Sequence, residues 1–240
     1  MTALLAARGV RNAAGRPVQI DIAVQETGAV GYERRILESG RLAVRPGWHD
    51  LFNGLAWALF PRAKAALNAR HVADLALHAG SQRSRVRDAL TTFDEDGVIL
   101  ATSDAVLADH VRRFRWKDLF WHERERLPGA FGVFVFGHGL AEKLLDPFVG
   151  LTAKAVIVEV EPAFFAQPPD PQLAELDDRV AARLRDADDF PTPRMLAPFP
   201  ILGMPGWWPA AAQESFYADT GYFRPGRRDR ATRDAYSGPS

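Results

Sequence analysis

The sequence of 240 residues contains no cysteine, and this absence excludes several kinds of protein at once. Without thiols there is no disulfide framework, no thiolate nucleophile and no cysteine-ligated zinc site. No apolar run approaches the roughly 18 residues that a membrane span needs. Arg8 interrupts the short apolar start too early for a signal peptide. We therefore expect a cytoplasmic protein with no membrane partner.

An excess of charge of either sign is also missing. Thirty basic and thirty acidic residues give a formal net charge of +0, so no overall field draws the protein to nucleic acid or to an anionic membrane. A chain of this length buries about 70% of its unfolded surface and needs no metal or disulfide to fold. We predict a single globular domain over residues 17–223, between a loose N-terminus (1–16) and a disordered Arg-rich tail (224–240).

Hydrophobic periodicity predicts a mostly helical chain around a small sheet. Helical spacing marks residues 33–39, 48–60, 61–77, 85–93, 103–114, 116–126, 137–145 and 173–186. Strands are predicted over 17–24, 98–101, 131–136 and 155–160, with 42–45 extended before Pro46. The fold class is α+β, or α/β if the strands at 131–136 and 155–160 are parallel neighbours. We expect the helical pair over 48–77 to pack on the sheet.

Two segments are predicted to lie outside the regular elements. Residues 191–209 are rich in proline and aromatic residues, which indicates an irregular C-terminal strap packed over the domain. Asp94-Glu95-Asp96-Gly97 is typical of a turn. A magnesium site built from some of these carboxylates is the alternative.

Polar side chains begin the predicted helix over 48–60, whose second half is apolar all round. His49 and Asn53 lie one helical turn apart, with Asp50 beside them. Because such groups need partners in a dry environment, they indicate an acid/base or metal-ligand cluster. The alternative is a helix cap by Asp50 and a structural histidine. We take His49 and Asp50 as candidate catalytic residues and Asn53 as a candidate substrate-binding residue.

The next helix carries Lys64 and Asn68 on one stripe, together with His71 and His78. The opposite arc is rich in alanine, which is also the ordinary pattern of a solvated face over a packing face. If the stripe faces His49 across the bend at Pro61, Lys64 and Asn68 are placed to bind an anionic group of a substrate.

A second candidate follows the strand at 131–136, in Gly137-His138-Gly139 and Glu142. A strand that runs into a glycine-flanked residue and then a helix places that residue at a sheet edge, where α/β units bind ligands. The helix dipole keeps His138 neutral near pH 7, so it can act as a base or a metal ligand. The alternative is that the glycines serve only tight packing.

Residues 110–126 alternate arginine and lysine with aromatic side chains, a combination that single-stranded nucleic acid would need. The aromatic residues recur at helical spacing, and three acids offset the positive charge. Core packing with a solvated rim is therefore the favoured interpretation, and nucleic-acid binding ranks last.

Several motifs resemble those of one family. They are Trp48-His49-Asp50-Leu51-Phe52-Asn53, Phe60-Pro61-Arg62-Ala63-Lys64-Ala65-Ala66-Leu67-Asn68, Thr92-Phe93-Asp94-Glu95 with Gly97, Phe136-Gly137-His138, Gly150-Leu151-Thr152-Ala153-Lys154 and Leu202-Gly203-Met204-Pro205-Gly206-Trp207-Trp208-Pro209. In this order they are similar to the signature blocks of an uncharacterised proteobacterial family, domain of unknown function 3025. The resemblance implies a single bacterial cytoplasmic domain and brings no activity or cofactor with it.

The site residues lead to one main hypothesis. We expect His49, Asp50 and Asn53 to converge with His138 and Glu142, with Lys64 and Asn68 nearby. Two imidazoles and two carboxylates suit a divalent metal or a metal-free acid/base pair. The expected function is hydrolysis or lyase chemistry on a small polar or phosphorylated metabolite. The alternative is a non-catalytic binding or interaction protein, and the sequence leaves the oligomeric state open.

Overall fold

The computed structural model describes residues 1–22, 28–78 and 83–226. Within them, the central element is a mixed sheet of four strands in the order β4-β3-β5-β6. The strands are β3 (Gly97–Thr102), β4 (Phe131–Val135), β5 (Thr152–Glu159) and β6 (Ala197–Pro200). β3 is parallel to β5 and antiparallel to β4, and β6 is antiparallel to β5. The predicted α+β class, with most of the chain helical, is confirmed.

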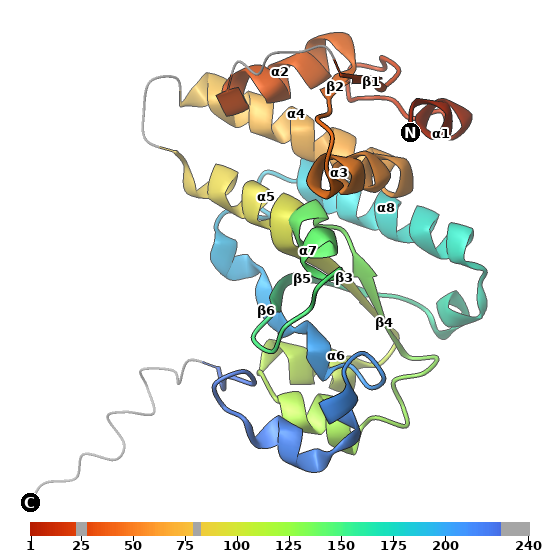
Figure 1. Cartoon of the computed structure of the whole chain (residues 1–240), viewed down its shortest axis with the longest axis vertical. Coiled ribbons are helices and arrows are strands. Elements are labelled where there is room, and N and C mark those ends of the chain that lie inside the picture. The colour runs from red at the N-terminus through yellow and green to blue at the C-terminus, as the bar shows by residue number, and fades with distance from the viewer. Residues whose placement is uncertain (23–27, 79–82, 227–240) are drawn as a thin grey trace, which may run out of the picture.

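Helices cover both faces of this sheet (Figure 1). On one side lie α3 (Trp48–Leu59), α4 (Pro61–Leu77), α5 (Arg85–Asp96), α7 (His138–Lys143) and α8 (Pro169–Arg185). Beyond them are α1 (Thr2–Ala7), α2 (Gly28–Ser39) and a small parallel sheet of β1 (Gln19–Asp21) and β2 (Arg41–Ala43). On the other side lie α6 (Ala105–Arg112) and η1 (Asp118–His122) with the C-terminal segment. Short helical turns η2 to η6 span Pro162–Ala166, Pro193–Met195, Ile201–Gly203, Pro209–Ala212 and Glu214–Ala218.

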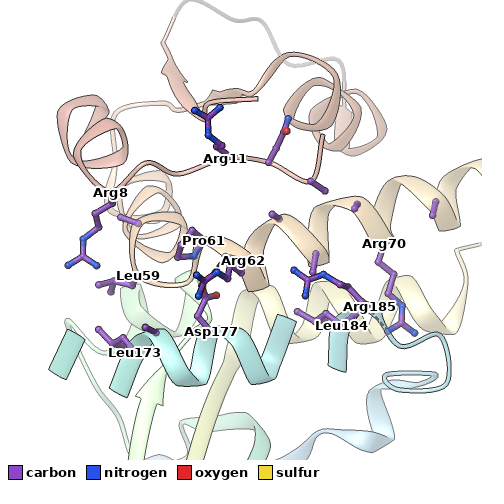
Figure 2. Close-up of a pocket in the computed structure, with 18 of the residues that line it drawn as sticks. Arg8, Arg11, Leu59, Pro61, Arg62, Arg70, Leu173, Asp177, Leu184 and Arg185 are labelled. Atoms are coloured by element: carbon purple, nitrogen blue, oxygen red, sulfur yellow. Dashed lines mark hydrogen bonds between the residues drawn. The ribbon is translucent and has the colours of Figure 1, made fainter. Parts of the chain in front are cut away.

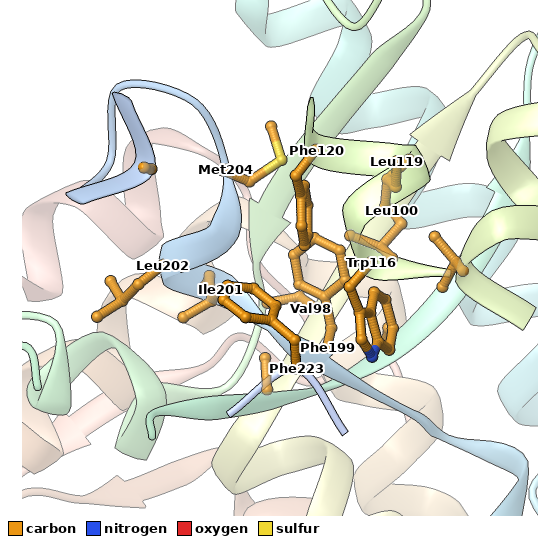
Figure 3. Close-up of a cluster of buried hydrophobic side chains, with 14 of the residues drawn as sticks. Val98, Leu100, Trp116, Leu119, Phe120, Phe199, Ile201, Leu202, Met204 and Phe223 are labelled. Atoms are coloured by element: carbon orange, nitrogen blue, oxygen red, sulfur yellow. The ribbon is translucent and has the colours of Figure 1, made fainter. Parts of the chain in front are cut away.

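The alternation of side chains along β3 divides the interior in two. Val98 and Leu100 point into the core that contains α6, η1 and the C-terminal segment, which Figure 3 shows. Ile99 and Ala101 point to the opposite face, toward α4, α5 and α8. All six residues of β3 are buried, as a strand covered on both faces requires.

The helix boundaries follow the local signals in the sequence. Pro61 is the first residue of α4 and separates it from α3, because a proline is tolerated only where no helical N–H is needed. Asp104 caps α6 by accepting a hydrogen bond from the backbone N–H of Val106 at 2.8 Å. The predicted helical pair is therefore confirmed, as is the start of α6.

The C-terminal strap contains an edge strand that the sequence analysis missed. Ala197–Pro200 pairs with β5 as β6, although two of its four residues are prolines, which an edge strand can accommodate. The expectation that the strap packs over the domain is confirmed, because Phe199 packs edge to face against Trp116 and Phe120. Ile201 and Leu202 are buried in the same cluster. The last residues of the predicted tail, 227–240, lie outside the described part.

Other expectations are corrected. Asp94, Glu95 and Asp96 do not form a turn, because they are the last residues of α5 and Gly97 begins β3. The strands at 131–135 and 152–159 are not neighbours, since β3 lies between them. The two linked helices do not form the layer that lies on the sheet: α4 packs mainly on α8, α2 and α5, and α3 contacts α7, α4 and the N-terminal elements, whereas α5 and α8 contact the strands.

The N-terminal segment that was expected to be loose contains α1. Its Leu5 is fully buried in a cluster with Leu42 and Trp57. In the basic segment, Trp116 and Phe120 are core residues, which supports the packing interpretation of that region. Among the described residues, no helix combines the length and the apolar character that a membrane span requires.

The start of α4 is held by a carboxylate from another helix. Phe60, which precedes α4, supplies no capping side chain, and Pro61 has no N–H. Asp177 of α8 fills this role: its carboxylate accepts from the backbone N–H of Arg62 at 3.0 Å and of Ala63 at 2.7 Å. Asp177 is 2% exposed, so this cap joins α8 to α4 inside the protein.

Replacement of this buried cap should be costly, and the adjacent position gives a matched control. We expect Asp177→Ala to lower the free energy of unfolding by about 2 kcal/mol, because two buried N–H groups lose their acceptor. Asp178→Ala removes only an exposed ion pair with Arg62 and should cost about 0.5 kcal/mol or less. Urea unfolding measures both. Equal losses in the two variants would contradict the assigned role of Asp177.

Candidate metal centre

Three segments that are distant in sequence meet at one end of the sheet. They are the first turn of α3, the last turn of α5 and the first turn of α7, and they bring together His49, Glu95 and His138. The approach of α7 to α5 depends on glycine. A Cβ on Gly137 would lie 2.4 Å from the backbone nitrogen of Gly97 and 2.5 Å from the carbonyl oxygen of Glu95, so no other residue fits without a backbone shift. The interpretation of these glycines as packing residues is therefore supported.

The two histidines predicted to converge are in contact. The Nε2 atoms of His49 and His138 are 3.1 Å apart, and the rings meet edge to face with centroids 4.5 Å apart. Glu142, one turn along α7 from His138, lies with Oε2 3.1 Å from Nδ1 of His49. Side chains of α7 thus contact both ring nitrogens of His49.

A carboxylate completes the cluster. Oε1 of Glu95 is 3.5 Å from Nε2 of His138 and 4.0 Å from Nε2 of His49. These three separations leave a point in the plane of the atoms that is about 2.1 Å from each of them. This distance matches the roughly 2.0–2.2 Å bonds that zinc makes with histidine nitrogen and carboxylate oxygen. Two imidazoles and one carboxylate can therefore hold a divalent ion here with little movement.

Burial sets the protonation of these groups. His138 is 5% exposed, and loss of hydration lowers its pKa to about 4, against the attraction of Asp94. The ring is consequently neutral at pH 7, the form that binds metals. Burial also raises the pKa of the Glu95 carboxyl, an effect that His49 opposes.

A buried lysine neutralises the carboxylate next to Glu95. Nζ of Lys64 donates to Asp94 Oδ1 at 2.5 Å and to Asn53 Oδ1 at 2.9 Å. Burial alone would raise the pKa of Asp94, but Lys64 lowers it below its usual value. Asn53 in turn donates to the hydroxyl of Tyr32 at 2.7 Å. The network links α4 and α5 to α3 and α2 directly behind the histidines.

The cluster opens into a cavity of about 300 Å³. Its walls come from α2, from β2 and the segment that follows it, from the first turns of α3, from α4 and α5, and from the start of α7. The lining residues are Tyr32, Glu33, Ala43, Arg45, His49, Asp50, Asn53, His71, Leu75, Arg83, Arg87, Thr91, Asp94, Glu95 and His138. The cavity is small, polar and continuous with the candidate metal ligands, so a bound molecule would meet them directly.

The structure places the sequence candidates in different ways. His49, His138 and Glu142 meet, and Lys64 and Asn53 lie in the network beside them. Asp50 turns away from the histidines, and its Oδ2 accepts from the backbone N–H and Nε of Arg45.

Asn68 is also held away from the histidines. It donates to Glu33 Oε2 at 2.6 Å and to the Glu33 carbonyl at 3.0 Å. The substrate-binding roles of Asn53, Lys64 and Asn68 stay predictions.

Sequence reasoning missed Glu95 as a partner of the histidines and Glu33 as a cavity residue. The magnesium alternative for residues 94–96 includes Glu95, but the predicted turn does not direct its side chain toward α7. Helical spacing was the available signal, because it places four polar residues on one face of α5: Arg87, Thr91, Asp94 and Glu95. All four line the cavity. The sequence around Glu33 contains no motif that marks it as a site residue, and only the packing of α2 places it at the cavity.

A larger cleft of about 1110 Å³ lies elsewhere, between the N-terminal segment, α4 and α8 (Figure 2). Alanines of α4 form much of its lining, and Arg8, Arg11, Arg62, Arg70 and Arg185 extend around it. No histidine is among its described lining residues, and its two buried carboxylates are engaged: Asp177 caps α4, and Asp74 accepts from the hydroxyl of Ser84. The cleft therefore offers binding surface and no acid/base or metal chemistry.

Fold and centre together define an α+β domain with a two-histidine, one-carboxylate cluster facing a small polar cavity. The chain belongs to the family described as "Protein of unknown function (DUF3025)", whose model matches residues 20–227. This agrees with the resemblance found in the sequence motifs, and the matched range contains the whole cluster. No match was found among the curated proteins or among the solved structures.

Glu33 gives the cavity a measurable pH dependence. Burial raises the pKa of its carboxyl from 4.5 to about 7, although the hydrogen bond from Asn68 opposes this. Between these pH values only the folded state keeps the proton, so the free energy of unfolding should fall as pH rises from about 4.5 to 7. Glu33→Gln stays neutral and can still accept from Asn68, so it should be more stable than the wild type by about 1–3 kcal/mol at pH 8 and nearly equal at pH 4.5.

Chemical denaturation across this pH range tests the prediction. Glu38→Gln, at an exposed position of the same helix, is the control and should follow the wild type. Parallel pH profiles for wild type and Glu33→Gln would show that Glu33 does not titrate in this way.

Proposed function

We propose that this protein is a metal-dependent enzyme of the hydrolase or lyase type that acts on a small polar or phosphorylated metabolite. The observation that carries the proposal is the convergence of His49 Nε2, His138 Nε2 and Glu95 Oε1 on one point at the wall of the cavity. With no cysteine to be oxidised, the proposal places the enzyme in a reducing bacterial cytoplasm.

The tautomers of the two rings support a cation between them. A carboxylate can only accept, so the contact with Glu142 puts the proton of His49 on Nδ1 and a lone pair on Nε2. Nδ1 of His138 is buried without a hydrogen-bond partner, and Asp94 Oδ2 is 3.8 Å away. A proton on this Nδ1 is attracted by that carboxylate, whereas a lone pair there would be repelled. In this tautomer both Nε2 lone pairs would face each other across the 3.1 Å contact, which is a hydrogen bond only when one ring carries its proton on Nε2. A metal ion between the rings would replace that hydrogen bond.

The donor set indicates the metal and its task. Two imidazole nitrogens and one carboxylate oxygen suit zinc and neighbouring first-row divalent ions, and three protein ligands leave a further position open to water or substrate. A metal in such a site lowers the pKa of bound water to about 7 and polarises a bound oxygen. In this chain Glu142 would orient His49, Lys64 would balance the charge of Asp94, and the cavity walls would confine the substrate.

The competing function is binding without catalysis. The arginine-lined cleft favours it, because several guanidinium groups around an alanine-rich surface suit an acidic partner. Under this hypothesis the histidine cluster only satisfies its own polar groups. Substitutions in the cluster would then lower stability without changing the response to any metal.

Metal binding separates the two functions. We expect the chelator-treated protein to bind one equivalent of Zn²⁺ by calorimetry. An excess of about 100-fold over Kd should raise the Tm by about 5–10 °C. His49→Ala, His138→Ala and Glu95→Gln should abolish both effects. Glu142→Gln should weaken binding by about 10- to 100-fold, because it removes the partner that orients His49.

The control is His122→Ala, which changes an exposed histidine whose nearest acid is Asp118 at 3.9 Å. It should bind zinc like the wild type. If wild-type protein binds neither zinc, cobalt nor manganese, or if His122→Ala loses as much affinity as His49→Ala, the metal centre is refuted.

A further inference from the structure

The part of the cavity formed by the start of α5 is cationic. Arg83 precedes the N-cap Ser84, Arg87 lies in the first turns of α5, and Arg45 comes from the segment before α3. The N-terminus of α5 adds the positive end of the helix dipole to this wall. An anionic molecule in the cavity would therefore be attracted to this wall.

Most charges around the cavity already have partners. Arg45 bonds to Asp50, Arg83 lies 2.8 Å from Asp88, and Lys64 is paired with Asp94. The guanidinium of Arg87 makes no hydrogen bond or ion pair with any residue in the described part of the chain, although it is half-buried. No described residue supplies an acceptor for its donors, so water or a ligand must supply one.

Glu33, an acidic residue that lines the same cavity, does not fulfil this role. Arg87 acts on it through space, since it contributes to lowering the pKa that burial raises. Yet the Glu33 carboxylate is bonded to Asn68, and no ion pair joins it to Arg87. Space for a ligand group is thus left beside Arg87, inside the cavity.

The position of Arg87 on α5 fixes how such a ligand would lie. Arg87, Thr91, Asp94 and Glu95 follow one face of the helix, and all line the cavity. Seven or eight residues separate Arg87 from Asp94 and Glu95, which corresponds to about 10–12 Å along the helix axis. A cavity of about 300 Å³ holds roughly ten water volumes, so only a small molecule can extend between these two ends.

We infer that Arg87, assisted by Arg83, binds the phosphate group of a small phosphorylated metabolite whose reactive end reaches the His49, Glu95 and His138 cluster. A dianionic phosphate suits two guanidinium groups beside a helix N-terminus better than a single carboxylate does. The assignment of a reactive end rests on the proposed function. Binding of the phosphate itself does not need the metal.

The test uses the full chain, treated with chelator, and inorganic phosphate as the probe. We expect phosphate to bind with a Kd of about 1 mM and to raise the Tm, while acetate and chloride at the same ionic strength do not. Arg87→Ala should weaken phosphate binding at least tenfold and change the Tm in chloride little, because its guanidinium has no hydrogen bond or ion pair to lose among the described residues. Arg85→Ala is the matched control: it removes the same charge from the same helix at an exposed position outside the cavity.

The outcomes separate this inference from the proposed function. Phosphate binding that survives in His49→Ala while zinc binding is lost supports two distinct parts of one cavity. Phosphate binding without any zinc binding in the wild type supports the role of Arg87 and refutes the metal centre. The inference is overturned if Arg87→Ala binds phosphate like the wild type, if Arg85→Ala loses equal affinity, or if acetate stabilises the protein as much as phosphate.

Discussion

The close backbone contact between Gly137 and the Glu95–Gly97 segment is the constraint from which the rest of the site follows. Both the N–H of Phe136 and that of Gly137 donate to the carbonyl of Gly97, at 3.0 and 2.8 Å. The antiparallel pairing of β3 with β4 brings these residues together, and the absence of a side chain on Gly137 lets α7 begin against the end of α5. Residues immediately on either side of this contact, Glu95 and His138, then face each other.

The surrounding core makes this contact hard to relax. Phe93 and Phe136 stack with centroids 4.4 Å apart on the two segments that meet. Nζ of Lys64 lies over the rings of Trp57 and Phe136, at 5.8 and 5.9 Å from their centroids, while it neutralises Asp94. Removal of either charge would leave the other buried without the opposite charge that it pairs with, which is strongly destabilising. The polar cluster is therefore supported by both apolar packing and buried charge compensation, as a preorganised site requires.

The predictable part of this structure is the part with local causes. Pro61 separates two helices because of its own geometry, Asp104 caps α6 through the next turn, and the β-branched run around Ile99 forms a strand. The convergence of His49 and His138 could be expected because both begin helices and both carry polar groups into apolar surroundings. Glu142 follows from His138 by helical spacing alone.

The rest depends on contacts between distant segments, which no local pattern contains. Asp94 and Glu95 look like a turn until Gly97 is known to start a buried strand, since Asp and Gly favour turns in isolation. Pro198 and Pro200 argue against a strand, yet β6 occupies a sheet edge where prolines are tolerated. Arg87 is an ordinary helix residue in the sequence, and it becomes notable only because packing places its guanidinium in a cavity where no described residue bonds to it.

X-ray absorption spectroscopy of the zinc-loaded protein tests the central claim most directly, because it reports the ligands of the metal themselves. The account predicts a first shell of nitrogen and oxygen at about 2.0–2.1 Å, with the outer-shell scattering of two imidazole rings. A spectrum without imidazole scattering, or one unchanged when both His49 and His138 are replaced, would contradict it.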